Sequence, residues 1–310
     1  LLMSTNNLKK KKVLLIRLDK IGDLICTLPV DQVFSEQYEI VWVVQKGLGA
    51  VVDLGSQKRR YYELDKANPQ KSAFELQKIL QDFKPDTAIS FQAPWWVNFE
   101  LFKARIPVRA GVLSQWHSFL FLNHGLRQKR SLAEKHEFDY NLELVQKTFH
   151  FLATKMYYHF EIKPKLDPQL LRQFNLTAHQ YQVVHPGMMG SALNWKQSQY
   201  ISLIEQQIHK SKTIVITGTD ADRIYLDKIY ERFKNTPQVI WLQSKLNLTE
   251  LVQILAQAEC VVAPSTGVAH LAASCGVTTY GIYSPIRVHA PQRWAPRGQN
   301  VSVSVPQVNC

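Results

Sequence analysis

Short apolar runs recur along this chain, and the longer stretches between them carry apolar residues at helical spacing. The runs fall at residues 13–16, 40–44, 87–91, 183–184, 213–217, 239–242, 260–263 and 278–283. Continuously apolar runs of this kind are typical of parallel strands covered on both faces. Apolar positions at 74, 76, 79, 80 and 83 mark one intervening helix, and residues 251–258 mark another. Alternating strands and helices predict an α/β fold with parallel sheets.

The alternation lapses between residues 160 and 179. Residues 163–168 read Lys-Pro-Lys-Leu-Asp-Pro, and two prolines in a charged stretch predict an extended linker. A chain of 310 residues also exceeds the usual size of one domain. We therefore predict two doubly wound, Rossmann-like domains that face each other across a cleft, with boundaries at residues 1–165 and 166–310.

Composition places the chain among ordinary globular proteins, with 45% apolar and 20% charged residues. No apolar run approaches the roughly 20 residues that span a bilayer, and residues 1–12 lack the apolar stretch of a signal peptide. These features predict a cytoplasmic protein. The four cysteines, at positions 26, 260, 275 and 310, do not have the spacing of metal ligands.

The formal net charge of +12 is concentrated in the first half, where residues 1–165 contain 25 Lys and Arg against 17 Asp and Glu. A basic half suits an anionic partner: nucleic acid, a phosphorylated glycolipid or the anionic face of a membrane. Nucleic acid is disfavoured because the sequence has no zinc-finger spacing, RNA-recognition aromatic motif or helix-turn-helix. A basic surface that only maintains solubility is the alternative.

Residues 111–135 combine apolar and basic side chains. Trp116 and the apolar residues 119–122 precede a cluster that contains Arg127, Lys129 and Arg130. Such a segment can form a lip that meets a lipid headgroup or membrane surface. The alternative is an ordinary amphipathic helix packed on its own domain.

Residues 13–30 run from a buried strand through a turn into a helix. Gly22 is predicted to allow the tight turn, and Asp23 falls where the helix begins, beside Lys20. Ligands of open α/β sheets bind at this carboxyl edge. A carboxylate in this position is either a helix cap or a catalytic group.

Two segments of the second half follow predicted strands and are rich in groups that suit a diphosphate. His185 and Gly187 begin the first, and Ser191, Asn194 and Lys196 follow with hydrogen-bonding groups and charge. A plain structural loop is the alternative there. In the second, Ser265 and Thr266 can cap a helix that begins near Gly267, and His270 lies one turn inside it. A helix N-terminus offers unpaired N–H groups and partial positive charge to an anion.

These motifs resemble, in order and spacing, those of glycosyltransferase family 9, the heptosyltransferase-like enzymes. The family's opening Gly-Asp and Leu-Pro correspond to Gly22-Asp23 and residues 28–29. Its His-Pro-Gly segment corresponds to residues 185–187, and its Thr-Gly-x-x-His pattern to residues 266–270. The turn at residues 218–223 places Asp222 on a Glu position, where a carboxylate can bind the ribose of a nucleotide.

The resemblance implies the GT-B arrangement of two domains and transfer of a heptose from an ADP-sugar to the phosphorylated core of lipopolysaccharide or another anionic glycan. It implies Asp23 as the general base, and the start of the 266–270 helix as the group that stabilises the departing diphosphate. Attack from the face opposite the diphosphate would invert the anomeric centre. Since a helix N-terminus together with basic side chains can take the place of a cation at the diphosphate, we expect no metal and no other cofactor.

The site residues that follow from these arguments fall into two sets. The predicted donor-binding residues are His185, Gly187, Ser191, Asn194, Lys196, Asp222, Ser265, Thr266, Gly267 and His270. The predicted acceptor-binding residues are Lys20, Gly22, Arg127, Lys129 and Arg130. An anionic glycolipid acceptor would bring the protein into peripheral contact with the cytoplasmic face of the inner membrane.

Three positions depart from the family pattern. Lys196 follows Trp195 where Pro is usual, Asn194 replaces a Lys or Arg, and Ser265 replaces Asp. The departures at Lys196 and Ser265 leave open a non-catalytic protein of the same fold that binds a sugar nucleotide or glycolipid. A nucleotide-sugar epimerase with the same fold is a further alternative. A dinucleotide-dependent dehydrogenase is disfavoured because residues 19–23 lack the Gly-x-Gly-x-x-Gly fingerprint.

Overall fold

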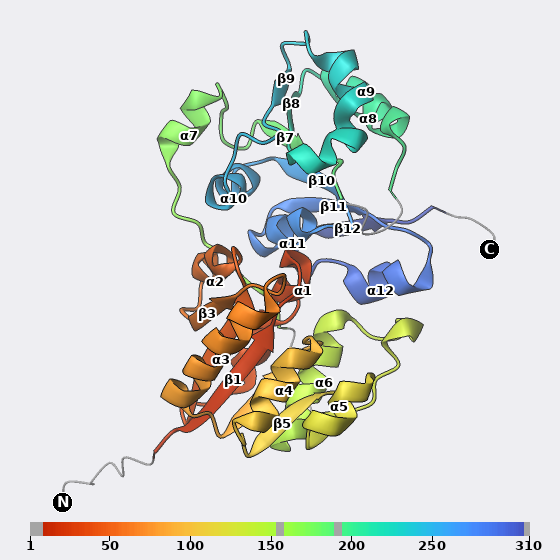
Figure 1. Ribbon diagram of the computed structural model, residues 1–310. Helices are drawn as coiled ribbons and strands as arrows, with labels where there is room; N and C mark the ends of the chain where they lie inside the picture. Colours follow the sequence, from red (N-terminus) through yellow and green to blue (C-terminus); the bar gives the residue numbers. More distant parts are fainter. Residues whose placement is uncertain (1–8, 153–157, 189–193, 307–310) are drawn as a thin grey trace, which may run out of the picture. The chain divides into compact units, whose positions relative to one another are not determined.

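A computed structural model describes residues 9–152, 158–188 and 194–306 of the protein. The chain divides into two compact units, each built on a six-stranded parallel sheet (Figure 1). The N-terminal unit contains residues 1–53, 58–129 and 137–158, and the C-terminal unit contains residues 54–57, 130–136 and 159–310. The main change of unit, at residues 158–159, precedes the predicted boundary at 165–166 by a few residues, and two short segments of the first half belong to the C-terminal unit.

The N-terminal sheet has the strand order β3-β2-β1-β4-β5-β6. This is the doubly wound order in which the first strand is central and the chain reverses direction of winding between β1 and β4. Its strands are β1 (Lys11–Arg17), β2 (Tyr38–Gln45), β3 (Arg60–Leu64), β4 (Thr87–Ser90), β5 (Val108–Val112) and β6 (His124–Leu126). The first part of the chain also forms the helices α1 (Ile21–Ile25), α2 (Gly49–Leu54), α3 (Pro69–Phe83), α4 (Trp95–Lys103), α5 (Trp116–Phe121) and α6 (Glu137–Phe149), with the 3-10 turns η1 (Leu28–Val33) and η2 (Arg130–Leu132).

The C-terminal sheet repeats that order. Read from β9, its strands run β9-β8-β7-β10-β11-β12, so β7 takes the place of β1 and β10 that of β4. The strands are β7 (Tyr181–Val184), β8 (Thr213–Ile216), β9 (Val239–Trp241), β10 (Cys260–Pro264), β11 (Thr278–Ile282) and β12 (Val301–Ser304). The helices are α7 (Pro168–Gln173), α8 (Gln197–His209), α9 (Arg223–Phe233), α10 (Leu248–Ala256), α11 (Gly267–Ser274) and α12 (Pro291–Trp294), with the turns η3 (Asp220–Asp222) and η4 (Arg287–His289).

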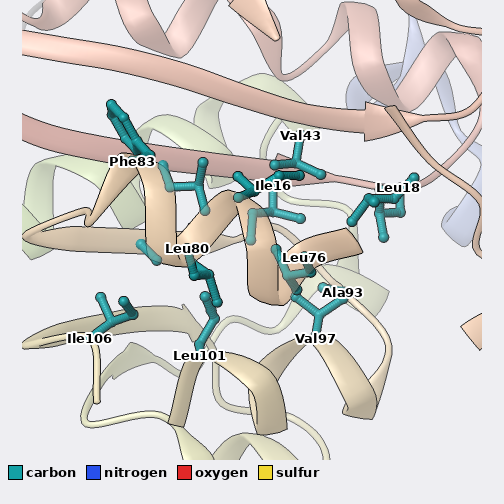
Figure 2. Packing of buried hydrophobic residues seen from close by; sticks show 14 of the residues in the cluster. Ile16, Leu18, Val43, Leu76, Leu80, Phe83, Ala93, Val97, Leu101 and Ile106 are labelled. Atoms are coloured by element: carbon teal, nitrogen blue, oxygen red, sulfur yellow. The ribbon is translucent and has the colours of Figure 1, made fainter. Parts of the chain in front are cut away.

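Side-chain alternation along β1 determines what each face of the N-terminal sheet touches. Leu14 and Ile16 point into a core that α3 and α4 close with Leu76, Leu80 and other apolar residues (Figure 2). Val13, Leu15 and Arg17 therefore point to the opposite face, where Glu137 at the start of α6 pairs with Arg17. One side of β1 is therefore packed against apolar side chains, and the other side carries the buried cation of Arg17.

The predicted strands all form, and the amphipathic spacing of α3 and α10 is also correct. Four strands were not predicted, β3, β5, β6 and β12. The prediction that Gly22 forms the turn after β1 is wrong. The helix α1 already begins at Ile21, so Gly22 lies inside the helix. Within the described residues, no helix combines the length and the apolar character that crossing a membrane requires.

Candidate active site

Asp23 lies in the first turn of α1, directly beyond the carboxyl end of the central strand β1. The side chain is 22% exposed, and the hydroxyl of Thr27 donates to the Asp23 carbonyl oxygen at 2.6 Å. Leu24, Ile25 and Leu28 are buried behind it and fix the short helix against the sheet. The point between β1 and β4, where the winding reverses, is where open α/β sheets bind ligands.

Arg17 is fully buried at the end of β1 and stands among three carboxylates. Its guanidinium nitrogens lie 2.5 Å from Oδ1 of Asp23, 3.0 Å from Oδ2 of Asp19 and 3.7 Å from Oε1 of Glu137. Lys66 adds a second cation, with Nζ 2.8 Å from Oδ1 of Asp19. We refer to Arg17, Asp19, Asp23, Lys66 and Glu137 as the charge cluster. Sequence reasoning found only Asp23 of these five residues.

The charge cluster changes the acidity of Asp23. Burial raises the pKa of the Asp23 carboxyl above its ordinary value, the Arg17 charge opposes that rise, and the charges of Asp19 and Glu137 add to it. A carboxylate with a raised pKa holds a proton more strongly and is therefore a better proton acceptor. The Asp23 side chain is also partly exposed and can meet a substrate, whereas the Glu137 side chain is completely buried.

The predicted acceptor-binding residues lie in two places. Lys20, the exposed N-cap residue of α1, and Gly22, in its first turn, adjoin Asp23. Arg127 and Lys129 are exposed and follow β6, three strands away from β1 in the same sheet, which corresponds to about 14 Å. Arg130 is only 6% exposed and belongs to the C-terminal unit, where its carbonyl oxygen accepts a hydrogen bond from Arg293.

In the C-terminal unit, the loops after β7 and β10 occupy the equivalent switch point. His185 follows β7 and is buried, with Nδ1 2.9 Å from the hydroxyl of Thr217. Burial lowers the pKa of His185 to about 4, against a smaller opposing influence from Asp222. The imidazole is therefore neutral at physiological pH.

Gly187 packs against the carboxyl group of Asp222 so closely that a Cβ atom on the glycine would lie 2.2 Å from Cγ of Asp222. Asp222 is buried, and its Oδ2 accepts hydrogen bonds from the backbone N–H and the hydroxyl of Thr219. Its Oδ1 has no partner among the described residues. The carboxylate predicted to meet a ribose thus lies inside the domain, where it supports the loop after β7.

Asn194 also supports that loop, because its amide donates to the carbonyl oxygen of Pro186 at 2.7 Å and its oxygen accepts from the Tyr200 hydroxyl at 2.8 Å. Lys196 is exposed at the N-cap of α8. Ser191 lies outside the described residues.

The start of α11 is an uncapped helix N-terminus. Thr266 is the N-cap residue by its backbone angles, but its hydroxyl makes no capping hydrogen bond, and that oxygen is buried without a partner among the described residues. Ser265 donates its backbone N–H to Ile282, and Gly267 opens the helix. Within the described part of the chain, the N-cap side chain therefore accepts no hydrogen bond from the first-turn N–H groups of α11, and N–H groups left uncapped in this way can bind anions.

His270 lies one turn into α11 and is 4% exposed. Burial lowers the pKa of His270 to about 3, and the nearby His136 contributes in the same direction. Like His185, it is neutral at physiological pH and offers a hydrogen bond rather than a charge.

Residues 73–310 match the family model described as glycosyltransferase family 9 (heptosyltransferase). The chain belongs to glycosyltransferase family 9. A curated Haemophilus influenzae protein named "Putative glycosyltransferase" is 27% identical over 305 residues, which cover 92% of this chain and 86% of the relative.

Two solved structures share the fold. A family 9 glycosyl transferase from Veillonella parvula has a TM-score of 0.81 at 18% identity and covers 96% of this chain and 87% of its own. The E. coli ADP-heptose LPS heptosyltransferase II has a TM-score of 0.75 at 17% identity and covers 94% and 90%. This glycosyltransferase thus has the GT-B fold that its two doubly wound sheets predicted.

Proposed function

We propose that this glycosyltransferase transfers a heptose or a related sugar from an ADP-sugar to a hydroxyl group of lipopolysaccharide core or another anionic glycan. The name of the E. coli neighbour, an ADP-heptose LPS heptosyltransferase, supports this choice of donor and acceptor class. The excess of basic residues in the first half suits an anionic acceptor. Such an enzyme would work at the cytoplasmic side of the inner membrane.

The observation that carries the proposal is the environment of Asp23. In the proposed reaction Asp23 removes the proton of the acceptor hydroxyl as the oxygen attacks the anomeric carbon. The bond from that carbon to the diphosphate breaks, and a single displacement of this kind inverts the anomeric configuration. The raised pKa and the partly exposed carboxylate of Asp23 support its role as the base.

We propose that the start of α11 receives the diphosphate of the donor. Two observations support this placement: the N-cap side chain leaves the first-turn N–H groups uncapped, and the buried hydroxyl of Thr266 has no partner in the described part of the chain. Each of these groups can donate to a phosphate oxygen. The neutral imidazole of His270 lies one turn away and can add a further hydrogen bond. The helix N-terminus would stabilise the charge that develops on the leaving group, so we expect the reaction to need no metal ion.

The first experiment compares Asp23→Asn with Asp19→Asn, because both variants remove one negative charge next to Arg17. ADP release from ADP-heptose in the presence of lipopolysaccharide core should fall about 100- to 10,000-fold in Asp23→Asn. It should change far less in Asp19→Asn. Equal losses in the two variants would show that the charge cluster, rather than a base at Asp23, is needed. Full activity of the wild type in excess chelator would agree with metal independence, and recovery only on adding a divalent ion would contradict it.

Donor binding is tested separately by thermal unfolding with ADP, UDP and GDP. ADP should raise the unfolding midpoint of the wild type most, because a ligand that binds the folded state stabilises it. Thr266→Val keeps the shape of the side chain but removes its hydroxyl, so the ADP shift should decrease, whereas Thr266→Ser should preserve it. A shift that is the same in all three proteins would remove Thr266 from the donor site.

A further inference from the structure

Two helices of the N-terminal unit carry large apolar side chains on the solvent-exposed face, which amphipathic helices usually keep polar. On α4 the exposed large side chains are Trp95, Phe99 and Phe102, which are 51%, 36% and 46% exposed. Their spacing of four and three residues places them on one stripe of the helix. The opposite stripe of α4 is also apolar, and it is buried in the core shown in Figure 2.

The neighbouring helix α5 also exposes large apolar side chains. Trp116, Phe119 and Leu120 are 62%, 50% and 64% exposed. The ring of Phe121 joins the two helices, because its centroid lies 5.3 Å from Phe99, 5.6 Å from Phe102 and 6.3 Å from Trp116. We refer to the six exposed residues of α4 and α5 as the aromatic patch. A continuous exposed apolar surface of this kind marks an interaction site.

The charges around the aromatic patch are almost all positive. Between Asp86 and Arg130, within the N-terminal unit, the chain contains five Lys or Arg residues, and its one acidic residue is Glu100. Glu100 is 6% exposed, accepts a hydrogen bond from Gln77 and pairs with Lys103, whose Nζ lies 3.8 Å from its carboxylate. Burial and this pairing reduce the negative charge that Glu100 presents at the surface. Lys103 and Arg105 are exposed directly after Phe102.

Two further arginines lie against the aromatic rings. The guanidinium carbon of Arg109 is 5.5 Å from the ring centroid of Phe102, and that of Arg127 is 5.2 Å from Phe119. Arginines beside Trp and Phe side chains combine attraction to anionic headgroups with apolar side chains that enter the interfacial region of a bilayer.

We propose that the aromatic patch docks the N-terminal unit onto an anionic lipid bilayer. Charge complementarity favours an anionic bilayer over a second copy of the chain. If two copies docked through their aromatic patches, the Lys and Arg residues around each patch would face one another and repel. The proposal goes beyond the proposed transfer reaction, since docking requires neither a sugar nucleotide nor a sugar acceptor.

The test is co-sedimentation of the full chain with vesicles of phosphatidylcholine alone or mixed equally with phosphatidylglycerol. The wild type should bind the mixed vesicles at least about tenfold more tightly, and salt should weaken this binding. Replacement of Trp116, Phe119 and Leu120 by serine should weaken it about tenfold or more, because apolar area that would enter the bilayer is lost. Lys103→Gln combined with Arg105→Gln should weaken binding to the mixed vesicles alone.

Two further variants separate docking from folding. Leu120→Glu changes one highly exposed residue and adds a negative charge, so it should abolish binding to mixed vesicles without lowering the thermal midpoint. Ile224→Glu is the matched control on α9 of the C-terminal unit, where Ile224 is 70% exposed, and it should bind as the wild type does. Transfer to a soluble acceptor should remain unchanged in both, so failure of docking and failure of the proposed reaction give different results.

Unchanged vesicle binding in the triple serine variant and in Leu120→Glu would overturn the proposal. It would also be overturned by a wild type that is dimeric in solution and becomes monomeric in these variants, because a second copy would then cover the aromatic patch.

Discussion

The central strands β1 and β7 occupy the same position in sheets of the same order, yet the groups that follow them differ in character. The carboxyl end of β1 is surrounded by charge, because Arg17, its last residue, is buried among three carboxylates. After β7 and β10 the chain places neutral groups: two imidazoles with lowered pKa values, a threonine hydroxyl that has no partner among the described residues, and a helix start without a side-chain cap from its N-cap residue. The shared topology places both sets of groups at a switch point, and under the proposed function the loop residues decide whether that point exchanges a proton or receives an anion.

The largest effect should come from removing the cation of the N-terminal site. Arg17→Met would leave Asp19, Asp23 and Glu137 without their buried partner, so we expect a loss of about 3–5 kcal/mol in the free energy of unfolding. Arg60→Met is the matched control, since Arg60 pairs with Glu39 at an exposed position and should contribute about 1 kcal/mol or less. Urea unfolding at neutral pH measures both. Equal losses would show that the charge cluster does not stabilise the N-terminal unit.

In the C-terminal unit, the buried histidines should instead make the free energy of unfolding depend on pH. Folded His185 and His270 remain neutral down to pKa values of about 4 and about 3, while both protonate near pH 6.5 when unfolded. The contribution of these neutral imidazoles to the free energy of unfolding is therefore fully present above pH 6.5. It decreases as the pH falls toward 4, by on the order of 3 kcal/mol for each imidazole.

Urea unfolding across this pH range would test that decrease. His185→Asn should reduce it, whereas His209→Asn, at an exposed position near the end of α8, should leave it as in the wild type. A slope that both variants share with the wild type would contradict the assignment of His185.

Close packing of the loop after β7 provides a smaller test. Gly187→Ala would place a Cβ atom 2.2 Å from Cγ of Asp222, and relieving that overlap should cost about 1–3 kcal/mol in the free energy of unfolding. The cost should be lower when Asp222 is already alanine, because the overlapping atoms are then absent. Equal costs in the two backgrounds, measured by urea unfolding, would contradict this packing.

The smallest predicted effect is a shift in the pH profile of the transfer reaction. Glu137 raises the pKa of Asp23 through its negative charge, so Glu137→Gln should lower that pKa and move the acidic limb of kcat/KM to lower pH. Glu75→Gln, at an exposed position on α3, serves as the control and should leave the limb unchanged. A limb that moves to higher pH in Glu137→Gln would be inconsistent with the charge cluster tuning Asp23.

Strands that are buried on both faces could be predicted from the sequence. Packing on both faces requires a continuous run of apolar side chains, and such a run is visible in the sequence. Three of the four strands missed from the sequence, β3, β6 and β12, are edge strands. Their side chains are mostly exposed or half-exposed, so the sequences Arg-Tyr-Tyr-Glu-Leu, His-Gly-Leu and Val-Ser-Val-Ser contain no continuous apolar run. Pairing with one neighbour makes them strands, and a local pattern cannot reveal that pairing.

The site residues also divide into those that a local sequence pattern reveals and those that depend on a distant partner. Asp23, Thr266 and Gly267 stand next to strand and helix boundaries, so their positions could be predicted. Glu137 meets Arg17 across 120 positions of sequence and could not be. One signal was available, since an arginine between Ile16 and Leu18 in a fully buried run requires a carboxylate partner.

The two short segments of the first half that belong to the C-terminal unit limit where this chain could exchange domains with a relative. Ser56 donates its backbone N–H to Glu161, and the His136 side chain lies 2.7 Å from the carbonyl oxygen of Ala295, so each segment is bonded into the C-terminal unit. A single crossover near residue 158 between two family members would give the C-terminal unit two foreign segments. Recombinants that keep residues 54–57 and 130–136 with their own C-terminal half should therefore survive more often than those that do not.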